Sequence, residues 1–290
     1  MLTGEISVLS WLESLRTPLL NTIMEAVSFL GEDTVLIVLV SILYFMFQKE
    51  SAYRICFVTV CSLGLNGIVK NICKIPRPFS TGRVTCVRPE TATGYSFPSG
   101  HTQNFATWTT AVSNILKKPW VWWTVLVLSA LMGFSRMYLG AHYPSDVVVG
   151  LLLGISVGFF GSVLYEKVKT PKKLLFPIFL GMVGFALIFL IAPDPHYADY
   201  FKCVGLMGGL TVSSLLDTRY GTMTYDVPFY KKLIRVAVAL VLALLLKEGT
   251  TLISFPNNLS LSLIWDGIRH WILITLVFGV YPLLLPKIKC

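Results

Sequence analysis

Long apolar segments recur along the chain, separated by short polar or charged stretches. Nine of them approach the roughly 20 residues that a helix needs to cross the hydrocarbon core of a membrane. They are 33–48, 53–72, 100–116, 119–139, 146–165, 174–192, 200–216, 233–253 and 264–285. The pattern predicts an all-α, polytopic transmembrane helical bundle of about nine spans. It divides into a core at 31–166 and additional C-terminal helices at 174–286.

The first 30 residues follow a different pattern. Apolar residues recur there at helical spacing, but Glu13, Arg16 and Glu25 interrupt them. These charges make a membrane span unfavourable. We therefore predict an N-terminal interfacial amphipathic segment at 1–30.

Composition agrees with a membrane protein. Hydrophobic residues make up 54% of the chain and charged residues 13%, whereas a soluble domain carries about a quarter charged residues. The net charge of +9 raises the question of nucleic acid. The basic residues are spread over short loops without interleaved aromatic residues, so no nucleic-acid partner is expected.

The basic residues indicate the orientation in the membrane. If 33–48 runs inward, the inner side receives fourteen of the 24 Lys and Arg residues, namely Lys49, Arg54, Lys117, Lys118, Lys167, Lys169, Lys172, Lys173, Arg219, Lys231, Lys232, Arg235, Lys287 and Lys289. The outer side receives nine, and six of these lie in or beside three short motifs. The positive-inside rule therefore places the motifs on the outer, non-cytoplasmic face.

The first two motifs suit an anion. Lys70 and Arg77-Pro78 stand at the outer end of the second apolar segment, where a single cation is often only a snorkelling anchor. Phe97-Pro98-Ser99-Gly100-His101 precedes an apolar helical run. Free amides at a helix N-terminus favour phosphate, so Ser99 and Gly100 are predicted to cradle it. His101, in the first turn, is the candidate general acid.

The third motif joins two predicted spans and contains Ser135-Arg136, His142 and Asp146. Pro144 suits the first turn of a helix, so His142 is expected just before that helix and Asp146 within its first turn. Asp146 can then orient one nitrogen of the His142 ring and raise the nucleophilicity of the other. A structural Arg136–Asp146 ion pair is the alternative.

In this order and in hydrophobic surroundings, the motifs resemble the tripartite signature of the type-2 phosphatidic acid phosphatase superfamily of membrane lipid phosphatases. The resemblance covers roughly residues 31–166, and every catalytic position of the signature is matched. It implies a phosphatase that uses no metal or other cofactor and forms a phosphohistidine. His142 is then the nucleophile, Asp146 orients it, and His101 protonates the leaving oxygen and later helps to activate water. Lys70, Arg77, Ser99, Gly100 and Arg136 hold the phosphoryl oxygens.

Several functions share these residues. The leading prediction is hydrolysis of a lipid phosphomonoester or diphosphate in a bacterial cell membrane, with undecaprenyl diphosphate as the first substrate considered. Phosphatidate, phosphatidylglycerol phosphate, sphingoid-base phosphates and transfer of phosphate to another lipid remain alternatives. Vanadium-dependent haloperoxidases resemble the same family, but they are soluble. A noncatalytic transporter or scaffold would be expected to lack some of the catalytic residues.

Two further patterns concern packing. Gly150, Gly154 and Gly158 recur every four residues, which predicts a helix face that a neighbouring helix approaches closely. Cys73 and Cys86 flank the outer loop and leave open a disulfide in an oxidising compartment.

Overall fold

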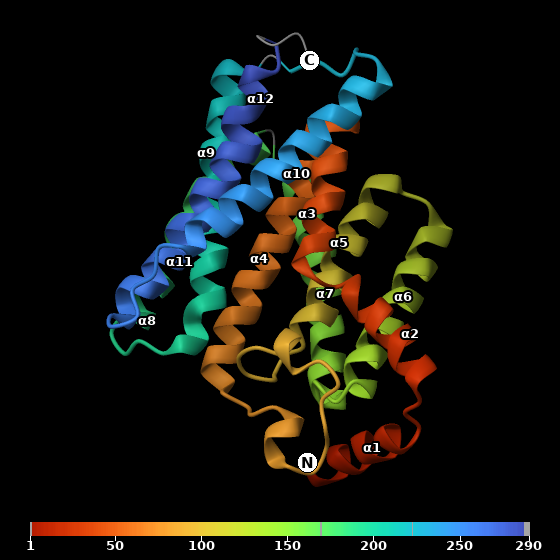
Figure 1. Cartoon of the computed structure of the whole chain (residues 1–290). Coiled ribbons are helices and arrows are strands. Elements are labelled where there is room, and N and C mark those ends of the chain that lie inside the picture. Colours follow the sequence, from red (N-terminus) through yellow and green to blue (C-terminus); the bar gives the residue numbers. More distant parts are fainter. Residues whose placement is uncertain (1, 169, 222, 287–290) are drawn as a thin grey trace. The chain divides into compact units, whose positions relative to one another are not determined.

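The computed structural model describes residues 2–168, 170–221 and 223–286, and the predicted inner-side residues Lys169, Lys287 and Lys289 lie outside these ranges. The helices are α1 (Leu2–Ser14), α2 (Pro18–Phe29), α3 (Asp33–Ile42), α4 (Lys49–Cys73), α5 (Gly100–Leu116), α6 (Pro119–Tyr138), α7 (Pro144–Lys167), α8 (Leu175–Phe189), α9 (Ala198–Tyr220), α10 (Phe229–Thr251), α11 (Leu259–Ile274) and α12 (Tyr281–Leu284) (Figure 1). The π-helical segments η1 (Leu43–Phe47) and η6 (Thr275–Val280) continue α3 and α11. The prediction of an all-α membrane protein is confirmed.

Each of the nine predicted apolar segments is helical. Five of the described helical segments are long and apolar enough to cross a membrane, and the bent pair α2 and α3–η1 raises this number to six. Helices α5, α9 and α10, which the sequence also predicts as spans, are not among them, and α5 has only 17 residues. It also carries Thr102, Gln103, Asn104 and Thr107, which are buried within the protein. A helix with such a polar buried face suits the interior of a bundle better than a lipid-facing position.

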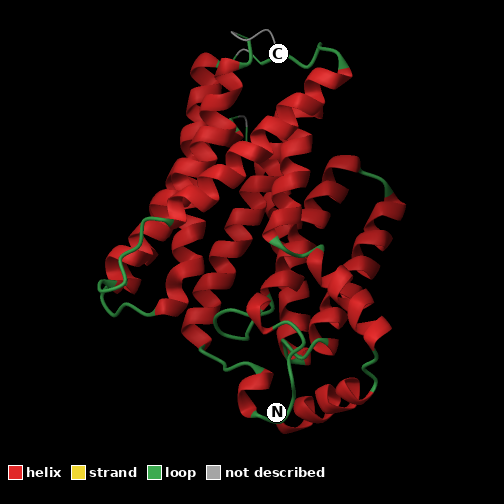
Figure 2. Ribbon diagram, viewed as in Figure 1, coloured by secondary structure: helices red, strands yellow, loops and turns green. Residues whose placement is uncertain are grey.

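Local signals define several helix ends. Thr17 caps α2, with its side-chain oxygen accepting from the Leu20 amide at 3.3 Å, and Pro18 follows at the first helical position. Lys117 ends α5 in the left-handed conformation, and Pro119 opens α6 immediately afterwards. Between α4 and α5, a long loop contains only the short 3-10 turns η2 (Pro78–Thr81) and η3 (Pro89–Thr91) (Figure 2).

The chain forms two compact units. The first comprises Met1–Leu36 and Cys61–Val163, and the second comprises Ile37–Val60 and Leu164–Cys290. The sequence prediction groups 37–60 with the core instead. In the structure this segment contacts the C-terminal helices, because the Tyr44 hydroxyl donates to the Phe278 carbonyl at 3.0 Å and the Phe45 ring lies 5.4 Å from that of Tyr281.

In the first unit, α7 packs closely on α5 through the three predicted glycines. A Cβ atom at Gly154 would lie 2.4 Å from the Gln103 carbonyl oxygen, and one at Gly158 would lie 2.6 Å from that of Thr107. Only glycine permits this approach. The prediction of a close helix face is confirmed, and the contact brings the N-terminal ends of α5 and α7 together.

The N-terminal helices of this unit cover the loop between α4 and α5. Leu9 and Leu12 of α1 are buried in a small cluster with Val84 and Tyr143. Arg16 donates to the Thr85 side chain at 2.8 Å and to the Tyr138 carbonyl at 3.0 Å. The predicted interfacial segment is thus helical and anchored to the loop, and its location at the membrane interface stays a prediction.

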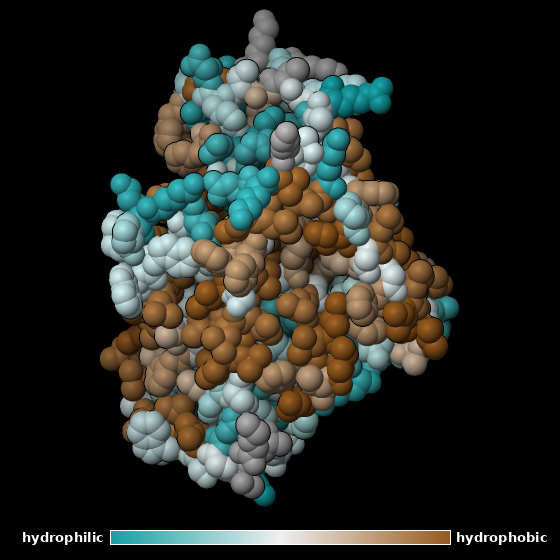
Figure 3. Space-filling view, turned by 180° about the vertical axis from the view of Figure 1, so that it is seen from behind, coloured by the Kyte–Doolittle hydropathy of each residue, from teal (hydrophilic) through white to brown (hydrophobic). Residues whose placement is uncertain are grey.

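Large apolar side chains cover the outside of the first unit. Trp123 of α6 is 71% exposed, and Phe160 of α7 is 69% exposed. The space-filling view shows hydrophobic residues over much of one face of the molecule (Figure 3). Exposed apolar surface of this extent is expected where lipid is the solvent.

Candidate active site

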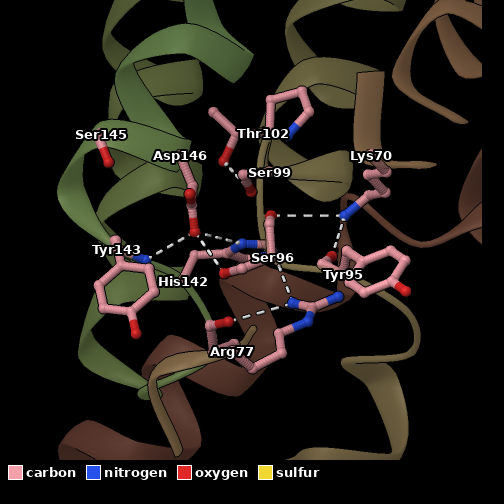
Figure 4. A network of polar contacts seen from close by, with 12 residues as sticks. Lys70, Arg77, Tyr95, Ser96, Ser99, Thr102, His142, Tyr143, Ser145 and Asp146 are labelled. Carbon is pink, nitrogen blue, oxygen red and sulfur yellow. Dashed lines mark hydrogen bonds and ion pairs between the residues drawn. The ribbon is translucent and has the colours of Figure 1, made fainter. Parts of the chain in front are cut away.

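All three motifs converge within the first unit. Lys70 lies in the last turn of α4, and Arg77 caps η2 in the loop that follows. His101 lies in the first turn of α5, Arg136 in the last turn of α6, and the loop after α6 carries His142. Asp146 occupies the first turn of α7. Figure 4 shows Lys70, Arg77, His142 and Asp146 side by side.

The His142–Asp146 pair has the expected geometry. His142 Nδ1 lies 3.2 Å from Asp146 Oδ2, and both side chains are buried. The same oxygen accepts from the Tyr143 amide at 2.9 Å and from the Ser96 hydroxyl at 2.5 Å. Three donors thus converge on one carboxylate oxygen and hold the ring in place.

The hydrogen bond from Arg77 indicates which tautomer His142 adopts. Its Nη1 atom lies 2.8 Å from His142 Nε2. A guanidinium can only donate hydrogen bonds, so Nε2 carries the lone pair and Nδ1 carries the proton that faces Asp146. The lone pair of the ring is therefore on the nitrogen directed away from the carboxylate, where a nucleophile would need it.

Burial lowers the pKa of His142 well below its ordinary value, and the neighbouring charges of Arg77, Lys70 and Arg136 add to this effect. The lowered pKa keeps the ring neutral at neutral pH. A neutral ring is required for Nε2 to act as a nucleophile.

Lys70 and Arg77 also organise the loop before α5. Lys70 Nζ donates to the Tyr95 carbonyl at 2.5 Å, and Arg77 donates through Nη2 to Thr93 at 2.5 Å and through Nε to Gly94 at 3.1 Å. Two of the predicted phosphate ligands thus hold backbone carbonyl oxygens in this structure.

Arg136 is completely buried at the end of α6. Its Nη1 atom donates to the Ser28 hydroxyl at 2.7 Å and lies 3.3 Å from the Thr91 hydroxyl. Its Nε and Nη2 atoms have no hydrogen-bond partner among the residues that the structure describes. A buried cation with two unsatisfied donors is costly, and an anion is its expected partner. The alternative Arg136–Asp146 ion pair is not among the salt bridges of the described residues.

The residues of the second motif make different contacts in the site. His101 Nε2 is buried and has no hydrogen-bond partner in the described part of the chain. A Cβ atom at Gly100 would lie 4.0 Å from Lys70 Cε, which places the start of α5 beside that lysine. The Ser99 amide donates to the Asp146 carbonyl at 3.0 Å, and its hydroxyl lies 2.9 Å from that of Thr102. Ser99 therefore ties α5 to α7, and its predicted binding of phosphate stays a prediction.

Three hydroxyl groups at this site, those of Ser96, Thr91 and Ser28, are not among the residues that the motifs predicted. Ser96 stands three residues before Ser99, so its proximity to the second motif was an available signal. Thr91 lies in the loop between α4 and α5 and Ser28 lies in α2, and neither belongs to a motif. Cys73 and Cys86 are both free thiols, so the structure contains no disulfide between them.

The segment that carries the three motifs, and the C-terminal part of the chain, are both similar to known protein families. Residues 51–170 match the PAP2 superfamily, and residues 201–290 match the family described as PAP2 superfamily phosphatase, transmembrane extension. An undecaprenyl-diphosphatase of Sulfolobus acidocaldarius is 32% identical over 158 residues, which cover 53% of this chain and 75% of that protein.

Two other proteins extend the comparison. A probable sphingosine-1-phosphate phosphatase of Dictyostelium discoideum is 24% identical over 236 residues, 73% of this chain and 57% of that protein. The crystal structure of a transmembrane PAP2 type phosphatidylglycerolphosphate phosphatase from Bacillus subtilis superposes with a TM-score of 0.51 at 25% identity, covering 58% of this chain and 87% of that one.

Proposed function

Because this chain belongs to the PAP2 superfamily and is a membrane lipid phosphatase, we propose that it hydrolyses a lipid diphosphate through a phosphohistidine at His142. Undecaprenyl diphosphate is the first candidate substrate. The observation that carries the proposal is the buried His142–Asp146 pair, in which the lone pair of His142 Nε2 faces the Arg77 guanidinium. The relative from Sulfolobus acidocaldarius supports the substrate, since its name describes the same reaction.

The first step transfers the phosphoryl group to the enzyme. His142 Nε2 bonds to phosphorus while the bond between phosphorus and the bridging oxygen breaks. His101 gives its proton to that oxygen, and the negative charge of the bound substrate favours the protonated ring. Asp146 stabilises the positive charge that develops on His142 through its bond to Nδ1.

The second step regenerates the enzyme. Neutral His101 takes a proton from water as the water oxygen attacks phosphorus, and the bond between phosphorus and Nε2 breaks to release inorganic phosphate. The fixed guanidinium groups of Arg136 and Arg77 and the Lys70 ammonium stabilise the charge on the phosphoryl oxygens. In other phosphoryl-transfer enzymes, metal ions provide this stabilisation.

A phosphate-release panel with purified protein tests the substrate. Undecaprenyl diphosphate is expected to give the highest kcat/KM, at least about tenfold above phosphatidate, phosphatidylglycerol phosphate and a sphingoid-base phosphate, a difference of about 1.4 kcal/mol in transition-state binding. Turnover is expected to persist in EDTA. Comparable rates on all four lipids would contradict the preference for the diphosphate, and a lipid acceptor that receives the phosphate would identify a transferase.

A sphingoid-base phosphate is one of the tested lipids because a second relative is named for that class of substrate. The relative from Dictyostelium discoideum aligns over 73% of this chain, beyond the length of the 51–170 match. A preference for this lipid would connect the C-terminal helices with substrate choice.

We place the active site on the outer face of the membrane, because the inner loops carry most of the basic residues outside the motifs. Cys73 ends α4, three residues after Lys70, and is exposed. A membrane-impermeant maleimide is expected to label it in intact cells, with the signal measured as the difference from Cys73→Ser. Lys118→Cys in the Cys73→Ser background, at an exposed position in a predicted inner loop, is the matched control whose introduced thiol should react only after lysis. The reverse pattern would overturn the orientation.

A further inference from the structure

We infer that Ser28 of α2 is a positioning residue for catalysis. Its hydroxyl orients the Arg136 guanidinium toward the substrate phosphoryl group. The inference rests on the proposed function, because it assigns Arg136 to the phosphoryl oxygens. Ser28 lies outside the three motifs, in the last turn of α2.

The hydrogen bonds of Arg136 are divided between its two edges. The Ser28 and Thr91 hydroxyls both accept from Nη1, at 2.7 and 3.3 Å. The Nε and Nη2 atoms, which lack a partner among the described residues, share the opposite edge of the planar group. Two parallel N–H groups on one edge match two phosphoryl oxygens. Because the Ser28 and Thr91 hydroxyls hold Nη1, the edge formed by Nε and Nη2 remains available for a phosphoryl group.

The position of Ser28 is well supported by packing. It lies in the last turn of α2 and is completely buried. Three residues later, a Cβ atom at Gly31 would lie 3.1 Å from Met132 Cε and 3.3 Å from His101 Cβ. The end of α2 thus packs directly against α6 and the catalytic histidine of α5. A hydroxyl fixed by this packing holds a long side chain more precisely than a mobile loop does.

The chemistry of the contact also favours positioning. A serine hydroxyl is a neutral acceptor, so it orients the guanidinium without neutralising its charge, as a carboxylate would do. The full positive charge stays available for the transition state, in which electrostatic stabilisation has its largest effect.

The test compares size-matched variants of Ser28 in the purified full-length protein. Ser28→Ala and Ser28→Val are expected to lower kcat/KM about tenfold, the lower end of what a hydrogen bond to a charged group contributes. The Ki for orthovanadate, a phosphoryl-like anion, is expected to rise by a similar factor. Ser28→Thr retains the hydroxyl and is expected to remain within about twofold of wild type. Ser129→Ala is the matched control, since Ser129 is a buried serine of the Arg136 helix without a hydrogen bond to that arginine.

A double-mutant cycle separates positioning from a general structural role. If Ser28 acts through Arg136, Ser28→Ala has no further effect in an Arg136→Gln background. An unchanged tenfold loss in that background, or wild-type vanadate affinity in Ser28→Val, would overturn the inference. Where Ser28→Ala fails to fold, the isosteric Thr and Val variants decide the same question. Absence of phosphate release by the wild-type protein would count against the proposed function instead.

Discussion

Replacing His142 with alanine is expected to lower the kcat of phosphate release by at least about 10⁴-fold, because no other described group stands in for the nucleophile. His142 Nε2 is the imidazole nitrogen that faces Arg77, and its ring is held by Asp146 on the other side. Removing the ring leaves cations that bind phosphate without attacking it. Phosphate release measured in detergent gives the rate, and rapid quenching with a ³²P-labelled substrate detects the acid-labile phosphoenzyme.

The chain offers a matched control for this variant. His196 lies 2.5 Å from Asp194 through Nδ1, but its side chain is 45% exposed and belongs to the second unit. His196→Ala removes the same type of pair and is expected to leave the rate within about twofold of wild type. Retained turnover or a remaining phosphoenzyme in His142→Ala would show that the nucleophile is a different group.

Replacing His101 with alanine is expected to affect two substrates differently. Phosphatidate releases an alkoxide, which needs a proton, so its rate should fall about 10³-fold, within the range for loss of a general acid. A lipid diphosphate releases a lipid phosphate, a far weaker base, so loss of the proton donor costs its first step much less. The second step still needs His101 to activate water, so the ³²P-labelled phosphoenzyme is expected to accumulate with the diphosphate.

His270→Ala is the control for this experiment, since His270 is a partly buried histidine of α11 in the second unit. It should change neither the rates nor the amount of phosphoenzyme. Equal losses on both substrates without accumulation of an intermediate would argue that His101 supports the structure of the site and carries no proton.

Local spacing explains which parts of the site could be read from the sequence. Pro144 starts α7, so His142 precedes the helix and Asp146 falls in its first turn, where a side chain reaches back four residues. The lengths of the apolar segments likewise predicted helices, since helix formation and burial in lipid depend on short stretches of chain. The glycines of α7 predicted a close helix contact for the same reason, although the partner could not be identified.

Contacts between distant segments could not be read in this way. Ser28 and Arg136 are separated by 108 positions, and Arg77 and His142 by 65. Nothing in the sequence near Ser28 distinguishes it from other serines of an apolar helix, and the pattern of the first 30 residues predicts a segment at the membrane interface. The packing of 37–60 with the C-terminal helices is another contact between distant segments.

The sequence by itself determined the helices, the membrane class, the order of the motifs and the His142–Asp146 pair, because these depend on neighbours within a few residues. The tertiary structure alone decided which edge of Arg136 is hydrogen-bonded and which has no partner among the described residues, that Ser96 shares the carboxylate with His142, and that Ser99 joins two helices. These features arise where helices far apart in the chain pack together, since packing sets the direction of each buried side chain.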